Sequence, residues 1–361
     1  MRFTRNNTQN DIKKFALFDI DEVELGKKLG CGGFSNVYQV KSFQPNNLRN
    51  RRIKRSHQEA REHLEQSNNG QYAIKFLKAE MLDNMERFDA AAIDLETEAT
   101  ILSRLDHENI LKLRGWAANG PKAYGNMKRH DGYFLLMDRL EKTLSTRIEE
   151  WKSLIDPTED NQEMRKNMLL EQLKLALDIA SALEYLHDKG YIFRDLKPDN
   201  IGMDSRSRGK LFDFGLARAM PKGNMDKTFE MSGKIGTARY MAPEVYKHMA
   251  YNTKADVYSF AHVLWEMLSL TKPYEHYSKT MHRKETVQKG VRPDLDPTWS
   301  SGIQKLLTKS WHCEIAERPT MKEVRTTLEI EIAELQEQRR TPEKQNARRL
   351  SRQTSLASAA A

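Results

Sequence analysis

Residues 191–204 read YIFRDLKPDNIGMD, and the stretch DFGLAR follows at residues 213–218. Asp195, Lys197 and Asn200 lie within six positions of one another. A carboxylate can accept a proton from a hydroxyl group, and an ammonium group can neutralise charge on a group that is being transferred. An amide oxygen, like the carboxylate that opens the second stretch, is a hard ligand for a divalent cation. The two stretches together are far more specific than any one of their residues.

A glycine-rich stretch, LGCGGFSNVYQV at residues 29–40, precedes an alternating strand pattern. Glycine lets backbone N–H groups approach a ligand closely, so a tight turn between two strands can cover a phosphate. An ordinary glycine-containing hairpin is the alternative, and this stretch alone does not decide between them. Downstream, YAIKFL places Lys75 on a strand and ETEATIL places Glu98 on a helix. Each is commonly a surface residue, but a lysine held by a carboxylate can also contact phosphate oxygens.

Two further motifs lie toward the C-terminus. GTARYMAPE places Glu244 where it can pair with Arg318 of ERPTM, and Asp256 begins a strongly apolar helix. In order and spacing, the set of motifs resembles the protein kinase family over about residues 20–335. DLKPDN with GTARYMAPE is similar to the serine/threonine kinases, and WHCEIAERPTM is similar to their tyrosine-kinase-like group.

The resemblance implies an α+β, two-lobed protein kinase fold, with a small strand-rich N-lobe that has one main helix and a larger, mainly helical C-lobe. Strand patterns occur in VYQV, QYAIKFL, ILKLRGW and YFLLMDRL, and helical spacing occurs in AAAIDLETEATILSRL, LLEQLKLALDIASALEYLHDKG and DVYSFAHVLWEMLSL. Three parts are expected: an N-terminal extension (1–20), a kinase domain (21–335) and a disordered basic Ser/Arg tail (336–361). Within the kinase domain, the N-lobe covers about 21–140, with a basic insert at about 41–70, and the C-lobe covers about 141–335.

The resemblance also implies an ATP-dependent serine/threonine kinase of intracellular signalling that transfers the γ-phosphoryl group of Mg-ATP to protein substrates. The residues expected to bind ATP are Gly30, Gly32, Gly33, Val37, Ala73, Lys75, Met137, Asp138 and Leu140. Asn200 and Asp213 are the expected ligands of Mg²⁺, with Mn²⁺ as an alternative. The expected catalytic residues are Asp195, Lys197, Lys75 and Glu98.

Three positions depart from the family pattern. Ser35 replaces the third glycine of the loop, Phe193 replaces a histidine, and Gly202 replaces the aliphatic residue beneath adenine. None of the three changes removes a group that touches phosphate, metal or the attacking hydroxyl. A scaffold protein without catalysis is the alternative that these departures favour.

The segment between Asp213 and Glu244 offers Thr228 and Ser232 as regulatory phosphorylation sites, of which Ser232 is favoured. In the resembling family, an arginine in the place of Arg194 belongs to a basic pocket that binds such a phosphate. An upstream kinase, or the chain itself, would add it. The alternative is a constitutively ordered segment in which an acidic residue already satisfies the arginine.

The chain has 361 residues, a net charge of +8 and two cysteines, too few for a disulfide framework. No apolar run reaches the length of a membrane span, so a cytoplasmic location is expected, with the nucleus as an alternative. Seven Lys/Arg face three Glu in residues 41–71, and six face two in residues 337–361. The remainder is neutral, which argues against a nucleic-acid enzyme and leaves an anionic partner of the basic insert open.

Overall fold

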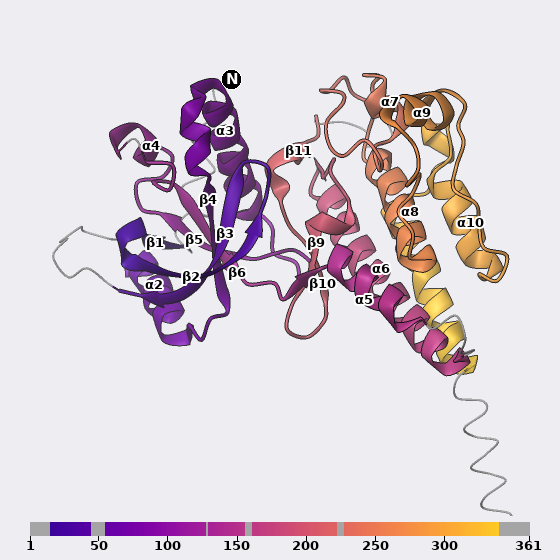
Figure 1. Ribbon diagram of the computed structural model, residues 1–361, viewed down its shortest axis with the longest axis horizontal. Coiled ribbons are helices and arrows are strands. Elements are labelled where there is room, and N and C mark those ends of the chain that lie inside the picture. The colour runs from indigo at the N-terminus through magenta and orange to yellow at the C-terminus, as the bar shows by residue number, and fades with distance from the viewer. Residues whose placement is uncertain (1–14, 45–54, 128, 156–160, 222–226, 339–361) are drawn as a thin grey trace, which may run out of the picture. The chain divides into compact units, whose positions relative to one another are not determined.

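The structure, a computed structural model, describes residues 15–44, 55–127, 129–155, 161–221 and 227–338 (Figure 1). The chain divides into two compact units. Unit 1 contains the chain up to Thr143 together with Asn200–Ala219, and unit 2 contains Leu144–Asp199 together with the chain from Met220 onward. Unit 1 is rich in strands and unit 2 is mainly helical, which confirms the expected α+β class.

A six-stranded sheet forms the centre of unit 1. Its strands are β1 (Ala16–Phe18), β2 (Val23–Cys31), β3 (Ser35–Phe43), β4 (Tyr72–Leu77), β5 (Leu113–Ala117) and β6 (Phe134–Asp138). The order is β1-β5-β6-β4-β3-β2, with β1 parallel to β5 and the other pairs antiparallel. All six residues of β4 are buried, because this apolar strand lies in the middle of the sheet. The strands expected from the four alternating patterns are confirmed.

The helices of unit 1 lie beside this sheet (Figure 1). They are α2 (Arg55–Ser67), α3 (Met85–Leu102) and α4 (Lys122–Met127), with 3₁₀ turns at Ile20–Glu22 and Ala79–Asp83. Asn84 caps α3, since its side chain accepts a hydrogen bond of 3.0 Å from the N–H of Arg87. The buried face of α3 carries Phe88, Leu95 and Glu98 at helical spacing, so the predicted glutamate points inward.

The expected N-terminal extension and basic insert both contribute to unit 1. β1 lies within residues 1–20 yet pairs with β5, and α2 lies within the insert and packs against β1. Arg61 of α2 donates a 2.9 Å hydrogen bond to Glu22, and a ring nitrogen of His57 lies 2.7 Å from the carbonyl oxygen of Phe15. These contacts explain why an insert without apolar periodicity folds as a helix. The most basic part of the insert, residues 45–54, lies outside the described residues.

A second, three-stranded sheet attaches residues 200–219 to unit 1, although the sequence placed them in the C-lobe. Its order is β10-β9-β7, from β7 (Lys142–Thr143), β9 (Ile201–Met203) and β10 (Gly209–Leu211). Backbone hydrogen bonds also join Leu211 to Asn109 and Leu111, each at 2.9 Å. These pairings account for the difference from the expected boundary. The remaining short elements near the junctions are β8 (Tyr191–Ile192), β11 (Arg218–Ala219) and the 3₁₀ turns Pro198–Asn200 and Phe214–Leu216.

Unit 2 is built around a buried helix, as the sequence predicts. Its helices are α5 (Leu144–Leu154), α6 (Gln162–Asp188), α7 (Pro243–Tyr246), α8 (Lys254–Ser269), α9 (Lys279–His282), α10 (Ser301–Ser310) and a helix at 321–338, with a π-helix at Arg283–Gln288 and a 3₁₀ turn at Ile315–Glu317. Twelve of the 16 residues of α8 are buried, so α8 is the core helix. The last helix continues past residue 335, and residues 339–361 of the expected tail lie outside the described residues.

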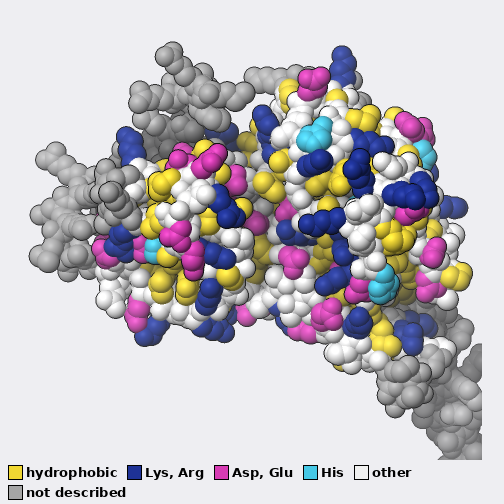
Figure 2. Space-filling model, turned by 45° about the horizontal axis from the view of Figure 1, so that its top comes forward, with side chains coloured by type: hydrophobic (Ala, Val, Ile, Leu, Met, Phe, Trp, Pro, Cys, Tyr) yellow, Lys and Arg dark blue, Asp and Glu magenta, His cyan; other side chains and the backbone are white. Residues whose placement is uncertain are grey.

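Charged side chains of both signs cover the face drawn in Figure 2, where Lys and Arg lie among Asp and Glu. Within the described ranges, no helix combines the length and the apolarity that a membrane span requires.

Candidate active site

Lys75 lies at the centre of an ion-pair cluster in unit 1. Its Nζ atom is 2.6 Å from Oε2 of Glu98 on α3 and 2.8 Å from Oδ1 of Asp213. Lys75 and Glu98 are 9% and 2% exposed, whereas the Asp213 side chain is 46% exposed. The predicted pairing of Lys75 with Glu98 is therefore confirmed, and the structure adds Asp213 to the same cation.

Burial and charge oppose each other in this cluster. Burial alone would lower the pKa of Lys75, but the negative charges of Asp213 and Glu98 outweigh it and raise that pKa above its ordinary value. Burial raises the pKa of Glu98, although the Lys75 ammonium acts in the opposite direction. Lys75 therefore carries a positive charge at neutral pH. Its ammonium group pairs with two carboxylates, the partly exposed one of Asp213 and the buried one of Glu98.

The two expected metal ligands lie in the same unit. The N–H of Phe212, the residue before Asp213, donates a 3.1 Å hydrogen bond to the carbonyl oxygen of Asn200. Asp213 has a φ of 65°, in the left-handed region that residues other than glycine rarely adopt. Asn200 is buried, whereas the Asp213 side chain is partly open. An amide and a carboxylate oxygen fit a hard divalent cation.

The glycine loop connects β2 to β3. Gly30 lies in β2, and the N–H of Gly32 donates a 2.9 Å hydrogen bond to the carbonyl oxygen of Ser35, closing the turn. None of the three expected glycines has a positive φ, and a Cβ added to Gly33 would meet no atom within 4 Å. Their contribution here is bare backbone rather than unusual dihedral angles, so the backbone of the loop can approach a ligand closely.

Strand register brings the loop close to the ion-pair cluster within unit 1. Gly30 lies opposite Val37, which in turn lies opposite Lys75 on the next strand. Ala73, two positions before Lys75, lies opposite Met137 on β6. The antiparallel sheet thus brings five residues predicted from separate motifs onto neighbouring strands.

The last two expected ATP-binding residues are Asp138, at the end of β6, and Leu140, two positions later. The Asp138 N–H donates to the carbonyl oxygen of Lys112 at 3.1 Å, and its carboxylate pairs with Arg114 at 2.6 Å. In the described part of the chain, the backbone N–H and C=O of Leu140 have no hydrogen-bond partner. Leu140 therefore has backbone groups available to a ligand, whereas the Asp138 N–H is already used.

In unit 2, Asp195 is held by two neighbours. Its Oδ1 atom accepts hydrogen bonds from the N–H and the hydroxyl of Thr237, at 2.8 and 2.9 Å. Its Oδ2 atom lies 2.8 Å from Nζ of Lys197, which also donates to the Thr237 hydroxyl at 3.1 Å. The structure brings together Asp195, Lys197 and Thr237, and it fixes the orientation of the carboxylate.

Arg194, next to Asp195, contacts the segment expected to be regulatory. Its Nη1 atom lies 3.0 Å from the Ser232 hydroxyl and 3.4 Å from the Tyr251 hydroxyl, which itself donates to the Ser232 carbonyl at 2.9 Å. Ser232 and Thr228 are both exposed. Arg194 has a φ of 72°, and its N–H donates to Asp256 at 2.9 Å. Of the two candidate hydroxyls, the Ser232 hydroxyl is the one that contacts an arginine.

The comparisons with known proteins agree with this arrangement. The family described as protein tyrosine and serine/threonine kinase matches residues 23–328, which is most of the chain. The chain belongs to this protein kinase family. Its members use ATP and a divalent metal ion and act on protein substrates.

Among curated relatives, this kinase chain is 28% identical over 327 residues to serine/threonine-protein kinase STY17 of Arabidopsis thaliana, covering 90% of this chain and 47% of that protein. It is 31% identical over 253 residues to serine/threonine-protein kinase STY46 of the same plant, covering 70% and 38%. The dual serine/threonine and tyrosine protein kinase of Strongylocentrotus purpuratus is 31% identical over 232 residues, covering 62% and 21%. The chain thus spans about half or less of the length of these relatives.

The structure shows what compensates for one departure from the kinase pattern, the glycine at position 202. A Cβ added to Gly202 would lie 2.4 Å from Cδ1 of Leu140, so the leucine side chain occupies the space that a side chain at position 202 would need. Leu140 thus provides apolar surface where Gly202 has none. Phe193 is buried, and its N–H donates to Asp256 at 2.8 Å.

The sequence analysis missed two residues of this kinase site. Gly236 has a φ of 100°, and a Cβ there would lie 2.4 Å from the carbonyl oxygen of Arg194, so the residue after it, Thr237, can reach Asp195. The motif GTARY contains this glycine and was the available signal. Tyr251 supports Ser232, and no local sequence pattern identified it.

A buried carboxyl group supports the GTARYMAPE segment from α8. The Tyr240 hydroxyl donates a 2.7 Å hydrogen bond to Glu266, which is 3% exposed. Burial raises the pKa of Glu266 to about 7. Glu266 therefore keeps its proton up to a higher pH in the folded kinase than in the unfolded chain.

This shift predicts a pH-dependent effect of Glu266→Gln. Between the unfolded pKa of 4.5 and about 7 the native state holds more protons, so the contribution of Glu266 to stability falls as pH rises. The variant keeps an acceptor for Tyr240 and should be more stable than wild type by about 1–3 kcal/mol at pH 8, with no gain at pH 4.5. Urea denaturation at both pH values measures this. An equal effect at the two pH values would contradict the assignment.

Proposed function

We propose that this chain is a serine/threonine kinase that transfers the γ-phosphoryl group of ATP, bound with Mg²⁺, to hydroxyl groups of protein substrates. The observation that supports it most is the pair of preformed clusters. In unit 1 a charged Lys75 is held by Glu98 and Asp213, and in unit 2 Asp195 is held by Thr237 beside Lys197. Each cluster consists of the residue types that phosphoryl transfer requires.

The nucleotide would bind to unit 1. The backbone N–H of Gly33 would face the phosphates, next to Gly32, whose own N–H closes the turn to Ser35. The Lys75 ammonium would pair with the phosphate oxygens. Val37 and Ala73 would pack on the adenine ring, with Met137 at its back and the free backbone groups of Leu140 as its hydrogen-bond partners. Gly30 would keep the strand close to the phosphates without a side chain in between. The side chain of Leu140 would supply apolar surface at Gly202, where a Cβ has no room.

Asn200 and Asp213 would hold the metal ion, whose charge neutralises the phosphate oxygens when it is bound. Asp213 would contribute a carboxylate oxygen, because its side chain is partly exposed. Mg²⁺ is the proposed ion and Mn²⁺ is the alternative, since both accept hard oxygen ligands.

Asp195 would orient the substrate hydroxyl and accept its proton, and Lys197 would neutralise charge on the transferred group. The two bonds from Thr237 to Oδ1 leave the carboxylate with one fixed orientation, so little reorganisation is needed when the hydroxyl arrives. Glu98 would act indirectly, because it holds the Lys75 ammonium in place.

The choice of acceptor is tested with matched peptides that differ only in carrying Ser, Thr or Tyr. DLKPDN and the relatives named serine/threonine kinases support Ser and Thr as acceptors, whereas one relative is named a dual-specificity kinase. With ATP and Mg²⁺ the purified chain should phosphorylate the Ser and Thr peptides. Transfer to the Tyr peptide at an equal or higher rate would contradict the proposed acceptor class. Replacing Mg²⁺ by Mn²⁺ in the same assay determines the preferred ion.

A scaffold role without catalysis is the second candidate, and the departures at Ser35, Phe193 and Gly202 favour it. The geometry weighs against a scaffold role, because every expected charged group is present in a paired position.

Both cysteines, Cys31 and Cys313, are free and exposed, which suits a reducing compartment. We therefore place the kinase in the cytoplasm, with the nucleus as the alternative.

An anionic partner of the basic insert is proposed only for residues 45–54, since the described Arg55 and Arg61 pair with Glu59 and Glu22.

Phosphorylation of Ser232 would regulate the kinase, through an upstream kinase or through the chain itself. A phosphate on this hydroxyl would lie against Arg194, which is 3.0 Å away and adjacent to Asp195. The added charge of about −1.5 to −2 can form charge-assisted hydrogen bonds with the guanidinium group. Thr228 is the weaker candidate, because among the described residues no Lys or Arg forms a hydrogen bond with its side chain.

Two single substitutions separate these sites. Ser232→Ala should lower activity by roughly tenfold or more relative to the phosphorylated wild type, and Thr228→Ala should change it little. Phosphatase treatment of wild type should have the same effect as Ser232→Ala, and rephosphorylation should reverse it. A double alanine variant as active as wild type would show that the switch lies elsewhere and that Arg194 is purely structural.

A further inference from the structure

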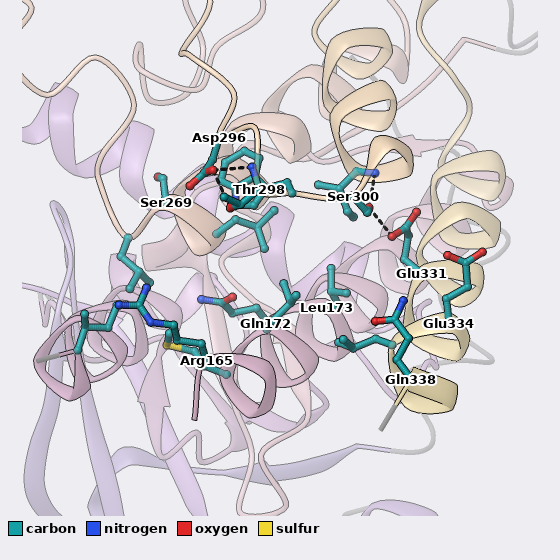
Figure 3. Close-up of a pocket in the computed structure, with 18 of the residues that line it drawn as sticks. Arg165, Gln172, Leu173, Ser269, Asp296, Thr298, Ser300, Glu331, Glu334 and Gln338 are labelled. Carbon is teal, nitrogen blue, oxygen red and sulfur yellow. Dashed lines mark hydrogen bonds between the residues drawn. The ribbon is translucent and has the colours of Figure 1, made fainter. Parts of the chain in front are cut away.

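A groove with a volume of about 650 Å³ lies in unit 2, outside the kinase site (Figure 3). It is formed by α6, the C-terminal end of α8, residues 294–303 and the helix at 321–338. None of the residues assigned to ATP, metal or substrate lines it. Its possible role is therefore separate from phosphoryl transfer.

The floor of the groove is apolar. It is lined by Met168, Leu169 and Leu173 of α6, Leu268 at the end of α8, and Leu335 of the last helix. Buried Gln172 is not free in this floor, because its amide donates a 2.6 Å hydrogen bond to the carbonyl oxygen of Met267. The floor thus offers surface to a leucine-sized side chain rather than to a polar one.

The rim of the groove is acidic. It is lined by Asp294, Asp296, Glu331 and Glu334, against a single cation, Arg165. Within the described residues, none of these four carboxylates forms an ion pair with Lys, Arg or His. In Figure 3, Glu331 and Glu334 project from one side of their helix, and Asp296 lies on the facing loop. An apolar floor under several uncompensated negative charges fits a basic segment with an apolar anchor.

Two of the carboxylates are held in place by neutral donors. Glu331 accepts a 2.5 Å hydrogen bond from the hydroxyl of Ser300, and Asp296 accepts bonds of 2.8 and 2.7 Å from the N–H and hydroxyl of Thr298. These bonds lower the pKa of Asp296 below its ordinary value. Carboxylates that are already fixed in place can bind arginine side chains without first being ordered.

A segment of matching chemistry follows directly in the sequence. Gln338 lines the groove, and residues 339–356 contain six Lys or Arg and a single Glu, together with Leu350 and Leu356. Leu350 lies twelve positions after Gln338, a stretch that spans up to roughly 40 Å when extended and is long enough to cross the groove. Covalent attachment beside the groove gives this segment a high effective concentration over any separate chain.

We propose that the groove binds the chain's own segment 339–356, with arginine side chains at the four carboxylates and Leu350 on the apolar floor. Phosphate on Ser351, which follows Arg348 by three positions, would place negative charge among these carboxylates and release the segment. This binding does not depend on the kinase activity proposed above, so each can fail without the other.

Photocrosslinking in the full chain tests this proposal. A benzoylphenylalanine incorporated at position 350 should crosslink within one chain to peptides that contain residues 165–173, 268–270 or 294–303. Glu334→Lys should reduce this product by at least about fivefold, because it reverses a charge at the rim. The matched control is Glu337→Lys, on the same helix but outside the groove lining, and it should leave the yield unchanged.

A second pair of variants changes the segment and leaves the groove intact. Replacing Arg348, Arg349 and Arg352 by glutamine, or Ser351 by aspartate, should also reduce the product, and 0.5 M salt should do the same by screening. Crosslinks that join two copies of the chain, that map outside the groove, or that persist at full yield in Glu334→Lys would each overturn the proposal.

Discussion

The Lys75→Met variant is expected to lose phosphoryl transfer by at least about a hundredfold, which corresponds to roughly 3 kcal/mol of transition-state stabilisation. The ammonium is the charged group that Glu98 and Asp213 hold at 2.6 and 2.8 Å, and methionine has similar length without the charge. The rate of ADP formation with a Ser peptide measures the loss. A variant that retains more than about a tenth of the wild-type rate would refute the role of Lys75.

The same substitution is also expected to cost stability, because it leaves the Glu98 carboxyl, 2% exposed, without its cation. A fall in activity alone could then reflect a damaged fold. The control is the double variant Lys75→Met with Glu98→Gln, which removes both charges. It should recover the stability of unit 1 and should stay inactive; recovery of activity along with stability would show that Lys75 only supports the fold.

The second large effect is expected at Arg318, whose side chain is fully buried and pairs with Glu244 at 2.6 and 2.9 Å. The guanidinium also donates to the carbonyl oxygen of His312 at 2.8 Å and lies over the Tyr258 ring at 5.0 Å. Arg318→Met leaves a buried carboxylate without a partner and should reduce the free energy of unfolding by about 3–5 kcal/mol.

A matched control shows whether burial causes this effect. Arg325 pairs with Glu184 and Glu329 on the surface, so Arg325→Met should cost under about 1 kcal/mol. Urea denaturation of the full chain at one ionic strength compares the two variants. Equal losses for Arg318→Met and Arg325→Met would mean that the buried pair does not hold unit 2 together.

Local patterns were sufficient to predict much of the fold and the charged clusters. The pattern in YAIKFL placed Lys75 on a strand, and ETEATIL placed Glu98 on a helix; the structure shows that the strand is central and that Glu98 lies on the buried face of α3. Because β4 and α3 must pack on each other, the two charges meet inside unit 1. The pairing of Glu244 with Arg318 was also predicted and is confirmed.

Features that depend on distant parts of the chain could not be predicted. β1 is three residues long and is a strand only because it lies beside β5, almost a hundred residues later. The contact of Leu140 with Gly202 joins segments that are about sixty residues apart, and it becomes visible only when β7 and β9 pair. The groove of unit 2 likewise needs four elements in place before its acidic rim exists.

The most direct test of kinase activity follows the γ-phosphate of labelled ATP in the purified full chain, with Asp195→Asn as the matched inactive variant. The amide keeps an oxygen for the two Thr237 bonds, so the variant should fold as wild type does. We expect Mg²⁺-dependent transfer of label to Ser and Thr residues by wild type, and at least about a hundredfold less by Asp195→Asn. Equal labelling by the two proteins, or none by wild type after phosphorylation of Ser232, would contradict it.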